Sequence, residues 1–368
     1  MRVLITNIGL GVPSGTTLYV RDLALELKRR GHEPIVYTSS AGVIARELQD
    51  SGILVTQSLR RLRAAPDLIH GHHWSVTFRA IRRFPSVPAI YICHDHMSRF
   101  DRAVIAPQVI QYFGVSQLCV ARLISEGVPG ERVNLLHNFV DTRRFVARTG
   151  LPERPQRALV FSNYARRDTH LPAVQEACQQ AGIELDVVGL LAGNPLSRPE
   201  TVLGRYDLVF AKAKAALEAM SSGAAVILCD FGGVGPLVKS ENFDRLREMN
   251  FGFQSLTDPL IPDSVLRQIE RYDPQDAARV CVRVRSSASL EDAVTRLCGI
   301  YEEVITGSGS LFAGAPRRTA RETLVEAVEA VKFILLRTWV AIPVAVRSRL
   351  KQLPGATWLL ARVKKAYR

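Results

Sequence analysis

Short hydrophobic runs alternate along the chain with longer segments in which hydrophobic residues recur every three or four positions. In the first 140 residues the short runs lie at 3–5, 35–37, 68–69, 89–92 and 112–115, and each has the length of a buried strand. Helical spacing is found at 16–30, which Gly31 ends, and at 41–51. Strands that alternate with helices predict parallel βαβ units with right-handed crossovers.

The alternation restarts after a polar stretch at 148–157, rich in arginine and proline, which we interpret as an interdomain linker. Beyond it, strands are expected at 158–161, 185–188, 208–209 and 225–228, and helices at 171–181, 214–222, 266–272 and 289–305. The run Gly307–Ser310 predicts a flexible joint. The pattern therefore predicts two doubly wound domains, 1–150 and 151–306, and a tail at 307–368.

Length and composition agree with a globular α/β protein. The chain has 368 residues, of which 47% are hydrophobic and 23% are charged, and this length suits two domains. Its six cysteines are far apart and form no C-x-x-C pair, as is typical of reduced core residues in intracellular proteins. The first residues contain no hydrophobic stretch of signal-peptide length. We therefore expect a cytoplasmic protein, either free or peripheral at the inner face of the membrane.

The positive charge is concentrated at the C-terminal end. The net charge is +13, and residues 317–368 hold twelve lysines and arginines but only three glutamates. Trp339, Trp358 and Tyr367 are interleaved with these basic residues, and no uncharged run approaches the ~20 residues of a membrane span. Basic amphipathic helices of this kind favour an anionic membrane surface. The alternative is a helical tail packed across the two domains. No nucleic-acid reader motif accompanies the charge, so nucleic acid is not an expected partner.

A glycine-rich turn follows the first strand and leads into a helix. Gly9, Gly11 and Gly15 are placed where backbone N–H groups and the helix dipole can bind an anion. The third glycine comes one residue later than in the dinucleotide fingerprint, and no acid ends the second strand. This disfavours an NAD(P) enzyme, whereas a tight turn without a ligand stays open. The sequence also lacks a P-loop and a nucleophile elbow.

Two histidine groups follow predicted strands. His70, His72 and His73 form one group, and His94 and His96 form the other. Zinc is one alternative, but neither group has an acid or cysteine at ligand spacing. Because the carboxyl ends of parallel strands line the ligand crevice, we expect these histidines there and expect no metal site.

In their order and spacing, these segments resemble the retaining GT-B glycosyltransferases of the large family that includes bacterial mannosyl- and glucosyltransferases, the family 4-like enzymes. The resemblance extends to about residue 240. Its main stretches are Gly11–Thr16, Leu23–Glu33, Asp67–His72, Tyr91–His94, Gly114–Ser116, Gly127–Phe145, Leu217–Gly223 and Asp230–Gly233. It implies an α/β GT-B fold, in which two Rossmann-like domains face a cleft, with the basic helical tail as an addition.

The resemblance also implies an activity, that of a nucleotide-sugar-dependent hexosyltransferase of polysaccharide or glycolipid biosynthesis. The donor would be a nucleoside-diphosphate sugar and the acceptor a glycan or a lipid-linked molecule. Transfer would proceed with retention and without a metal, and no cofactor is expected because the nucleotide-sugar is a substrate. The alternative is a non-catalytic GT-B protein that binds a nucleotide or a partner at a membrane or assembly.

Family roles can be carried over to matching positions. Gly11, Gly15 and Thr16 would approach the phosphates and sugar of the donor. His94 would contact the transferring sugar, and Glu218 would hold the ribose hydroxyls, since a carboxylate accepts well from two adjacent hydroxyls.

The sequence departs from the family pattern in two places. The family has a first glutamate eight positions before the second, where this chain has Phe210, and that residue supports the non-catalytic alternative. The expected arginine facing the pyrophosphate is replaced by Asn163, and no Lys-Gly pair follows, so Arg166 or Arg167 is a substitute. We hypothesise that Lys212 and Lys214 partly replace the missing cations at a helix start. The alternative is that both lysines are solvated.

Overall fold

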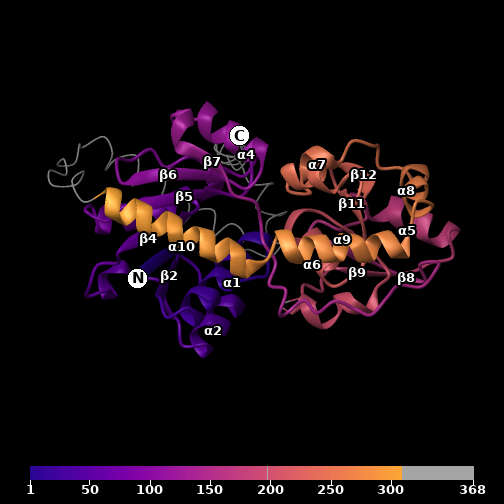
Figure 1. Cartoon of the computed structure of the whole chain (residues 1–368), viewed down its shortest axis with the longest axis horizontal. Coiled ribbons are helices and arrows are strands. Elements are labelled where there is room, and N and C mark those ends of the chain that lie inside the picture. The colour runs from indigo at the N-terminus through magenta and orange to yellow at the C-terminus, as the bar shows by residue number, and fades with distance from the viewer. Residues whose placement is uncertain (197, 309–368) are drawn as a thin grey trace, which may run out of the picture. The chain divides into compact units, whose positions relative to one another are not determined.

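The computed structural model describes residues 1–196 and 198–308. The basic tail at 307–368, with its predicted membrane contact, lies outside the described residues from residue 309 on. Figure 1 shows two α/β domains, the first in indigo and purple and the second in pink and orange.

The first domain is built on a seven-stranded sheet in which every pair of neighbours is parallel, with the order β3-β2-β1-β4-β5-β6-β7. Its central strands are buried on both faces, as expected for a sheet covered by crossover helices. The strands are β1 (Arg2–Asn7), β2 (Glu33–Thr38), β3 (Leu54–Thr56), β4 (Leu68–His72), β5 (Ala89–Cys93), β6 (Val109–Gly114) and β7 (Val133–Leu135). The helices are α1 (Gly15–Arg29), α2 (Val43–Asp50), α3 (Trp74–Arg83) and α4 (Gln117–Ser125).

The second domain has a five-stranded sheet with the order β12-β11-β10-β8-β9, in which only β12 is antiparallel. Its strands are β8 (Arg157–Phe161), β9 (Glu184–Val188), β10 (Leu208–Ala211), β11 (Ala225–Asp230) and β12 (Gly233–Leu237). The helices that follow in the chain are α5 (Leu171–Gln180), α6 (Ala213–Ser221), α7 (Phe243–Glu248), α8 (Pro262–Ile269), α9 (Pro274–Ser287) and α10 (Leu290–Gly307). Two doubly wound parallel sheets were expected, and this expectation is confirmed.

The chain crosses between the domains at different places from those that the sequence suggested. Phe139 packs in the core of the first domain and Val140 in that of the second, so the first crossing precedes the predicted linker at 148–157. The chain returns after Ala288, whose carbonyl accepts from the Val140 N–H at 2.9 Å. Helix α10 then packs beside α1 on the first core, as Figure 1 shows. The packing therefore differs from the predicted boundaries at 150 and 306.

Helix α10 buries a hydrophobic stripe of Leu290, Val294, Leu297, Tyr301 and Val304 against the first domain. This stripe has the spacing of one helix face, and the same periodicity had predicted the helix. The periodicity could not predict which surface packs against this face, because an amphipathic helix indicates only that some apolar surface must cover it.

Replacing Tyr301 with phenylalanine should lower the free energy of unfolding by about 1–3 kcal/mol, because a buried nitrogen loses its partner. The Tyr301 hydroxyl lies 2.5 Å from His70 Nδ1, and both side chains are fully buried. Tyr19→Phe is the matched control, because the buried Tyr19 hydroxyl has no hydrogen-bond partner among the described residues. Urea unfolding should find Tyr19→Phe neutral or stabilising; equal losses in the two variants would contradict the prediction.

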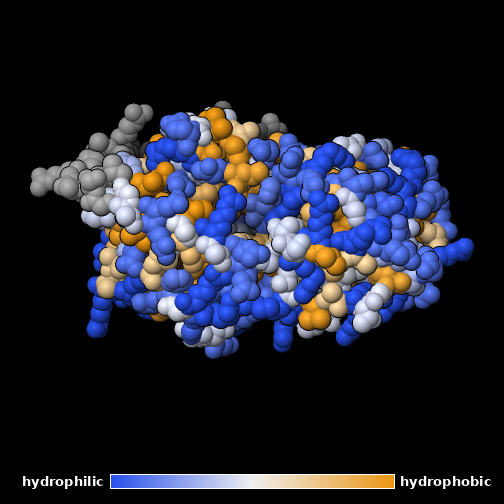
Figure 2. Space-filling view, viewed as in Figure 1, coloured by the Kyte–Doolittle hydropathy of each residue, from blue (hydrophilic) through white to orange (hydrophobic). Residues whose placement is uncertain are grey.

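Three further observations concern the surface, the cysteines and the length of the helices. The face in view in Figure 2 is mostly hydrophilic, with small hydrophobic areas between. All six cysteines are free thiols; five are buried and Cys298 is half-buried, in agreement with the expectation of reduced core residues. Among the described residues, no helix is long and apolar enough to cross a bilayer.

Candidate functional site at the junction of the two domains

The loops that follow the strands of the two sheets meet at the domain junction. Pro13, which follows β1, accepts a hydrogen bond of 3.0 Å from the side chain of Asn163, which follows β8. The ring of His96, beyond β5, lies 6.0 Å from that of Phe253 in the second domain. In open α/β sheets this edge of the strands binds ligands, so the junction is the candidate site.

The glycine loop is held in place by the cap of α1. Ser14 accepts from the Thr17 N–H at 3.3 Å, and Thr17 Oγ1 accepts from the Ser14 N–H at 2.8 Å, which forms a capping box. Gly11 and Gly15 are exposed, and a methyl group added to either would meet no atom within 4 Å. Thr16 is half-buried at the first turn of α1. This loop therefore leaves room for an anion at the helix N-terminus.

Asn163 has a role that the sequence did not suggest. Where the resemblance led us to expect an arginine, its amide donates to Pro13 and its Oδ1 accepts from the Leu190 N–H at 3.0 Å. One side chain thus ties the glycine loop of the first domain to the loop after β9. A short amide gives no charge signal in a sequence, which is why this role was not predicted.

His94 lies in a stack of imidazole rings where β4 and β5 end. Its Nε2 is 2.7 Å from His72 Nδ1, and the centroids of the two rings are 4.8 Å apart. His72 is fully buried, whereas His94 is half-buried. Burial lowers the pKa of both imidazoles well below the usual value, so both are neutral at physiological pH. The expectation that His94 lies at the carboxyl end of its strand agrees with this position.

A buried acid holds the backbone of His94. Asp101 Oδ1 accepts from the His94 N–H at 2.7 Å, and the Asp101 side chain is almost fully buried. Burial raises the pKa of this carboxyl to about 7, with a further contribution from the charge of Asp95. The acid lies 4.0 Å from His73, whose pKa burial lowers to about 4.

Asp101 by itself should contribute a stabilisation that declines as the pH rises from about 4 to about 7, opposite in sign to the contribution of the buried histidines whose pKa is lowered. The folded pKa of about 7 lies above the unfolded value, so the native state binds the proton more tightly and its stabilising effect is lost as the pH approaches 7. Asp101→Asn keeps the oxygen acceptor but cannot lose a proton, so the stability of this variant relative to the wild type should rise with pH in urea unfolding between pH 4.5 and 8. Asp50→Asn, at an exposed position, should keep the wild-type profile.

The start of α6 presents one lysine to the junction. Lys212 is the N-cap residue and provides no side-chain cap; its ammonium lies 3.5 Å from Asp230 Oδ2 and 5.5 Å from the centroid of the Tyr164 ring. The side chain is 23% exposed, so the ammonium can still meet an anion. Asp230 in turn accepts from the Phe231 N–H at 2.7 Å and the Ser162 hydroxyl at 3.2 Å.

Lys214, in contrast, is buried and already paired. Its ammonium donates to Asp22 Oδ2 at 2.9 Å and to the Phe139 carbonyl at 3.1 Å, and it lies 3.5 Å from Glu218 Oε1. The structure therefore separates the two lysines: Lys212 can reach a ligand, whereas Lys214 joins α6 to the first domain. Neither lysine is fully solvated, the alternative that the sequence left open.

Glu218 lies beside Lys214 and is 1% exposed. Burial raises the pKa of its carboxyl, and Oε1 has no hydrogen-bond partner among the described residues. Its ion-pair partner, the ammonium of Lys214, lies at 3.5 Å, which is long for a hydrogen bond, and a buried oxygen with so weak a partner is uncommon in native proteins. This oxygen is therefore open to an additional donor, although a ligand reaches it only if the side chain turns or the contact between α1 and α6 loosens.

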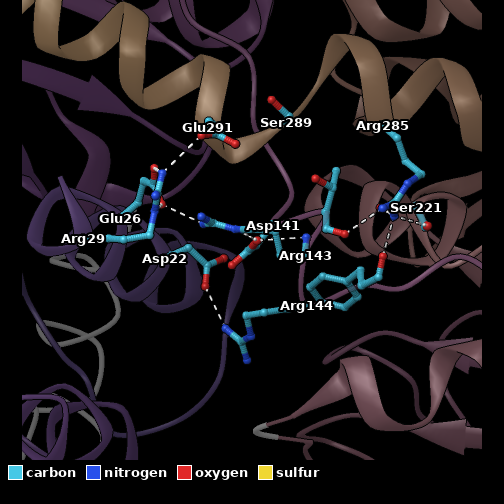
Figure 3. Close-up of polar contacts among 12 residues, drawn as sticks. Asp22, Glu26, Arg29, Asp141, Arg143, Arg144, Ser221, Arg285, Ser289 and Glu291 are labelled. Atoms are coloured by element: carbon cyan, nitrogen blue, oxygen red, sulfur yellow. Dashed lines mark hydrogen bonds and ion pairs between the residues drawn. The ribbon is translucent and has the colours of Figure 1, made fainter.

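A wider network of charges extends from Asp22, as Figure 3 shows. Glu26 of α1 accepts from Arg143 at 2.7 Å and from Arg29 at 2.8 Å, and these arginines help to lower its pKa to about 2 although burial opposes the shift. Arg144 reaches Asp22 at 3.1 Å. On the second domain, Arg285 donates to the Thr142 and Phe145 carbonyls. The network fixes the first crossing segment to both domains.

Arg166, the expected substitute for a pyrophosphate cation, is paired with an acid of its own loop and lines a neighbouring pocket. It pairs with Asp168 at 2.7 Å and lines an open pocket of about 500 Å³ between the loops after β8 and β9. Arg167, Leu171, Val187 and Leu191 are among the other lining residues. Arg166 and Lys212 are therefore not in direct contact.

An aromatic cluster at the junction was also missed. The rings of Tyr164, Phe231 and Phe253 are in sequential contact at 5.1 and 5.4 Å between centroids, and Tyr164 and Phe231 are 45% and 37% exposed. Gly232 permits this arrangement, because a methyl group there would lie 2.2 Å from the Phe253 ring. The three aromatics are distant in the sequence and follow no periodic pattern, so only the fold brings them together.

Known proteins resemble this chain in sequence over part of its length and in fold. Residues 13–144 match the family description Glycosyltransferase Family 4. No curated protein sequence matches the chain significantly. Anabaena HepE in complex with UDP has a TM-score of 0.62 at 14% identity, with 82% of this chain and 100% of that chain covered. The same protein with UDP-glucose gives 0.60 at 16% identity, again over 82% and 100%. Sucrose-phosphate synthase from Thermosynechococcus elongatus gives 0.59 at 13% identity over 83% and 99%. The chain has the fold of these proteins, so the expected GT-B architecture is confirmed.

Proposed function

We propose that the protein is a glycosyltransferase that takes a sugar from a nucleoside-diphosphate sugar bound at the domain junction. The observation that carries this proposal is an open glycine loop at α1, which Asn163 ties to the second domain, together with the partly exposed Lys212 at the start of α6, whose ammonium lies over the ring of Tyr164, the residue after Asn163. The family match over residues 13–144 and the UDP and UDP-glucose complexes of Anabaena HepE support a nucleotide-sugar as the ligand.

In this proposal each part of the donor has its own protein partners. The diphosphate lies near Gly11, Gly15 and Thr16 and is neutralised by Lys212, and the half-buried His94 meets the transferring sugar. Glu218 accepts from a ribose hydroxyl, which would supply Oε1 with a closer donor than the Lys214 ammonium at 3.5 Å. Lys214 has a structural role, because its ammonium is already paired.

The proposed reaction breaks the bond between the anomeric carbon and the diphosphate oxygen and forms a bond from that carbon to an acceptor hydroxyl oxygen. The acceptor proton leaves with the diphosphate, and attack from the same face retains the configuration. Negative charge grows on the departing diphosphate, where Lys212 and the backbone N–H groups of the glycine loop would stabilise it without a metal. The acceptor is a glycan or a lipid-linked molecule, which the basic tail would help to meet at a membrane.

A non-catalytic GT-B protein is the second candidate. Phe210, in place of the first family glutamate, is fully buried within β10 and cannot contact a sugar. The donor sugar thus loses one expected carboxylate, which favours binding without turnover.

The first test is a thermal-shift screen with UDP-, GDP- and ADP-sugars, followed by calorimetry and a nucleotide-release assay with membrane lipids and glycans as acceptors. The proposal expects stabilisation by one nucleotide class, turnover with an acceptor, and weaker binding in Glu218→Ala. Glu303→Ala, at an exposed position of α10, should bind as the wild type does. Binding without turnover favours the second candidate, and no nucleotide binding overturns the transferase and leaves only a non-catalytic protein that binds a partner.

A further inference from the structure

The hydrogen bond between His72 and His94 fixes where the proton of each ring must lie. Both imidazoles are neutral, so each carries one N–H and one bare nitrogen. Since His72 Nδ1 and His94 Nε2 are 2.7 Å apart, one of these two nitrogens is the donor and the other is the acceptor. Two arrangements are therefore possible, and they present opposite chemistry at the free nitrogen of His94.

The surroundings of His72 decide between the two arrangements. If His94 donated, His72 would carry its proton on Nε2, a fully buried atom with no hydrogen-bond partner among the described residues. If His72 donates from Nδ1, the buried Nε2 is a bare nitrogen instead. Buried N–H groups without an acceptor are rarer in native proteins than unpaired acceptors. The proton between the rings is accordingly assigned to His72.

We propose that His72 is a positioning residue that locks His94 in the tautomer with its proton on Nδ1. His94 Nε2 is occupied as an acceptor, and Nδ1 has no hydrogen-bond partner among residues 1–196 and 198–308. The half-buried ring thus presents an N–H donor at the junction. A donor selects ligand oxygens with free lone pairs, such as a sugar hydroxyl, and rejects an N–H or ammonium group. This ligand class rests on the proposed function, whereas the tautomer does not.

The tautomers can be read directly in the full-length protein. In ¹⁵N-labelled protein, two-bond ¹H–¹⁵N correlation spectra separate protonated from bare imidazole nitrogens. The expected result is a protonated Nδ1 and a bare Nε2 on both His72 and His94, each assigned by the loss of its signals in a single variant. A bare Nδ1 on His94, or a doubly protonated ring at pH 7, would overturn the proposal. No nucleotide is needed, so this outcome is independent of the proposed activity.

Three variants separate positioning from packing. His72→Phe keeps a ring but has no donor, and should mix the two tautomers of His94. His72→Gln can again donate to His94 Nε2 and should restore the Nδ1 proton. His70→Phe is the matched control, because His70 is equally buried in the same stack but bonds to Tyr301. An unchanged His94 tautomer in His72→Phe, or the same change in His70→Phe, would refute the role of His72. Should a nucleotide-sugar support turnover, His72→Phe should lower kcat more than it raises KM, and His72→Gln should rescue it.

Discussion

Replacement of Asp22 by alanine is expected to lower the free energy of unfolding by about 3–5 kcal/mol, the usual cost of breaking a buried ion pair. The Asp22 carboxylate forms ion pairs with Arg21 at 2.8 Å, Lys214 at 2.9 Å and Arg144 at 3.1 Å. Without it, the ammonium of Lys214 keeps Glu218 as its only carboxylate within 4 Å among the described residues, at 3.5 Å. A buried cation that has lost its nearest counter-charge is costly because the protein interior solvates it poorly.

Two comparisons make this result specific. Glu33→Ala removes an exposed acid from a pair with Arg2 at 3.1 Å and should cost less than about 1 kcal/mol. The double variant Asp22→Leu with Lys214→Leu should recover the part of the loss that the unpaired Lys214 causes, whereas the part due to the buried Arg21 should remain. Chemical unfolding measures all three. A small loss in Asp22→Ala, equal to that of Glu33→Ala, would mean that the contact between α1 and α6 does not stabilise the fold.

Hydrophobic periodicity predicted much of the secondary structure, but it did not predict this contact between α1 and α6. The central strands and most helices were located within a few residues, because buried parallel strands and amphipathic helices follow repeating patterns. The edge strands β3, β7 and β12 were missed. β3 and β7 have three residues each, and β12 contains two glycines and a proline, so none repeats long enough to be detected. The predicted helix at 266–272 overlaps α8 but begins too late, and α3, α4, α7 and α9 were not predicted.

The charged residues of α1 were harder to interpret. Arg21, Asp22 and Glu26 lie on a helix whose periodicity suggests a solvent side, yet all three are buried. Their partners come from α2, α6 and the segment 141–144. A sequence does not say which distant cation will meet a given acid, so the difference between Lys212 and Lys214 became visible only in the fold.

The candidate site was therefore predictable in part. The strand ends that carry the glycine loop, His94 and Lys212 follow from the α/β pattern together with the rule that ligands meet the carboxyl ends of parallel strands. Asn163 and the cluster of Tyr164, Phe231 and Phe253 did not, because their contacts join loops separated by tens of residues. The difference is physical: strand ends are set by local periodicity, whereas contacts between loops depend on the approach of the two domains.

Lys212 should have the largest effect on turnover of any residue at the junction. Replacing it with methionine keeps an unbranched side chain over Tyr164 but removes the ammonium that we propose stabilises the departing diphosphate. Loss of one such preorganised group typically lowers kcat by about 10²–10³-fold. Nucleotide affinity should fall as well, since a charge-assisted contact contributes about 1.5–3 kcal/mol. Nucleotide release with the donor selected by the screen measures the first effect, and calorimetry with the nucleoside diphosphate measures the second.

The matched control is Lys239→Met, which makes the same change near the other end of strand β11, away from the candidate site. Antiparallel pairing puts Leu237 of β12 beside Ile227, near the start of β11, whereas Asp230 at the end of β11 lies beside Lys212. Lys239→Met should therefore leave turnover unchanged, and Lys212→Arg, which keeps the charge, should retain part of it. If Lys212→Met bound nucleotide and turned over like the wild type, the diphosphate would have to be neutralised elsewhere, and Arg166 and Arg167 in the neighbouring pocket would be the next cations to replace.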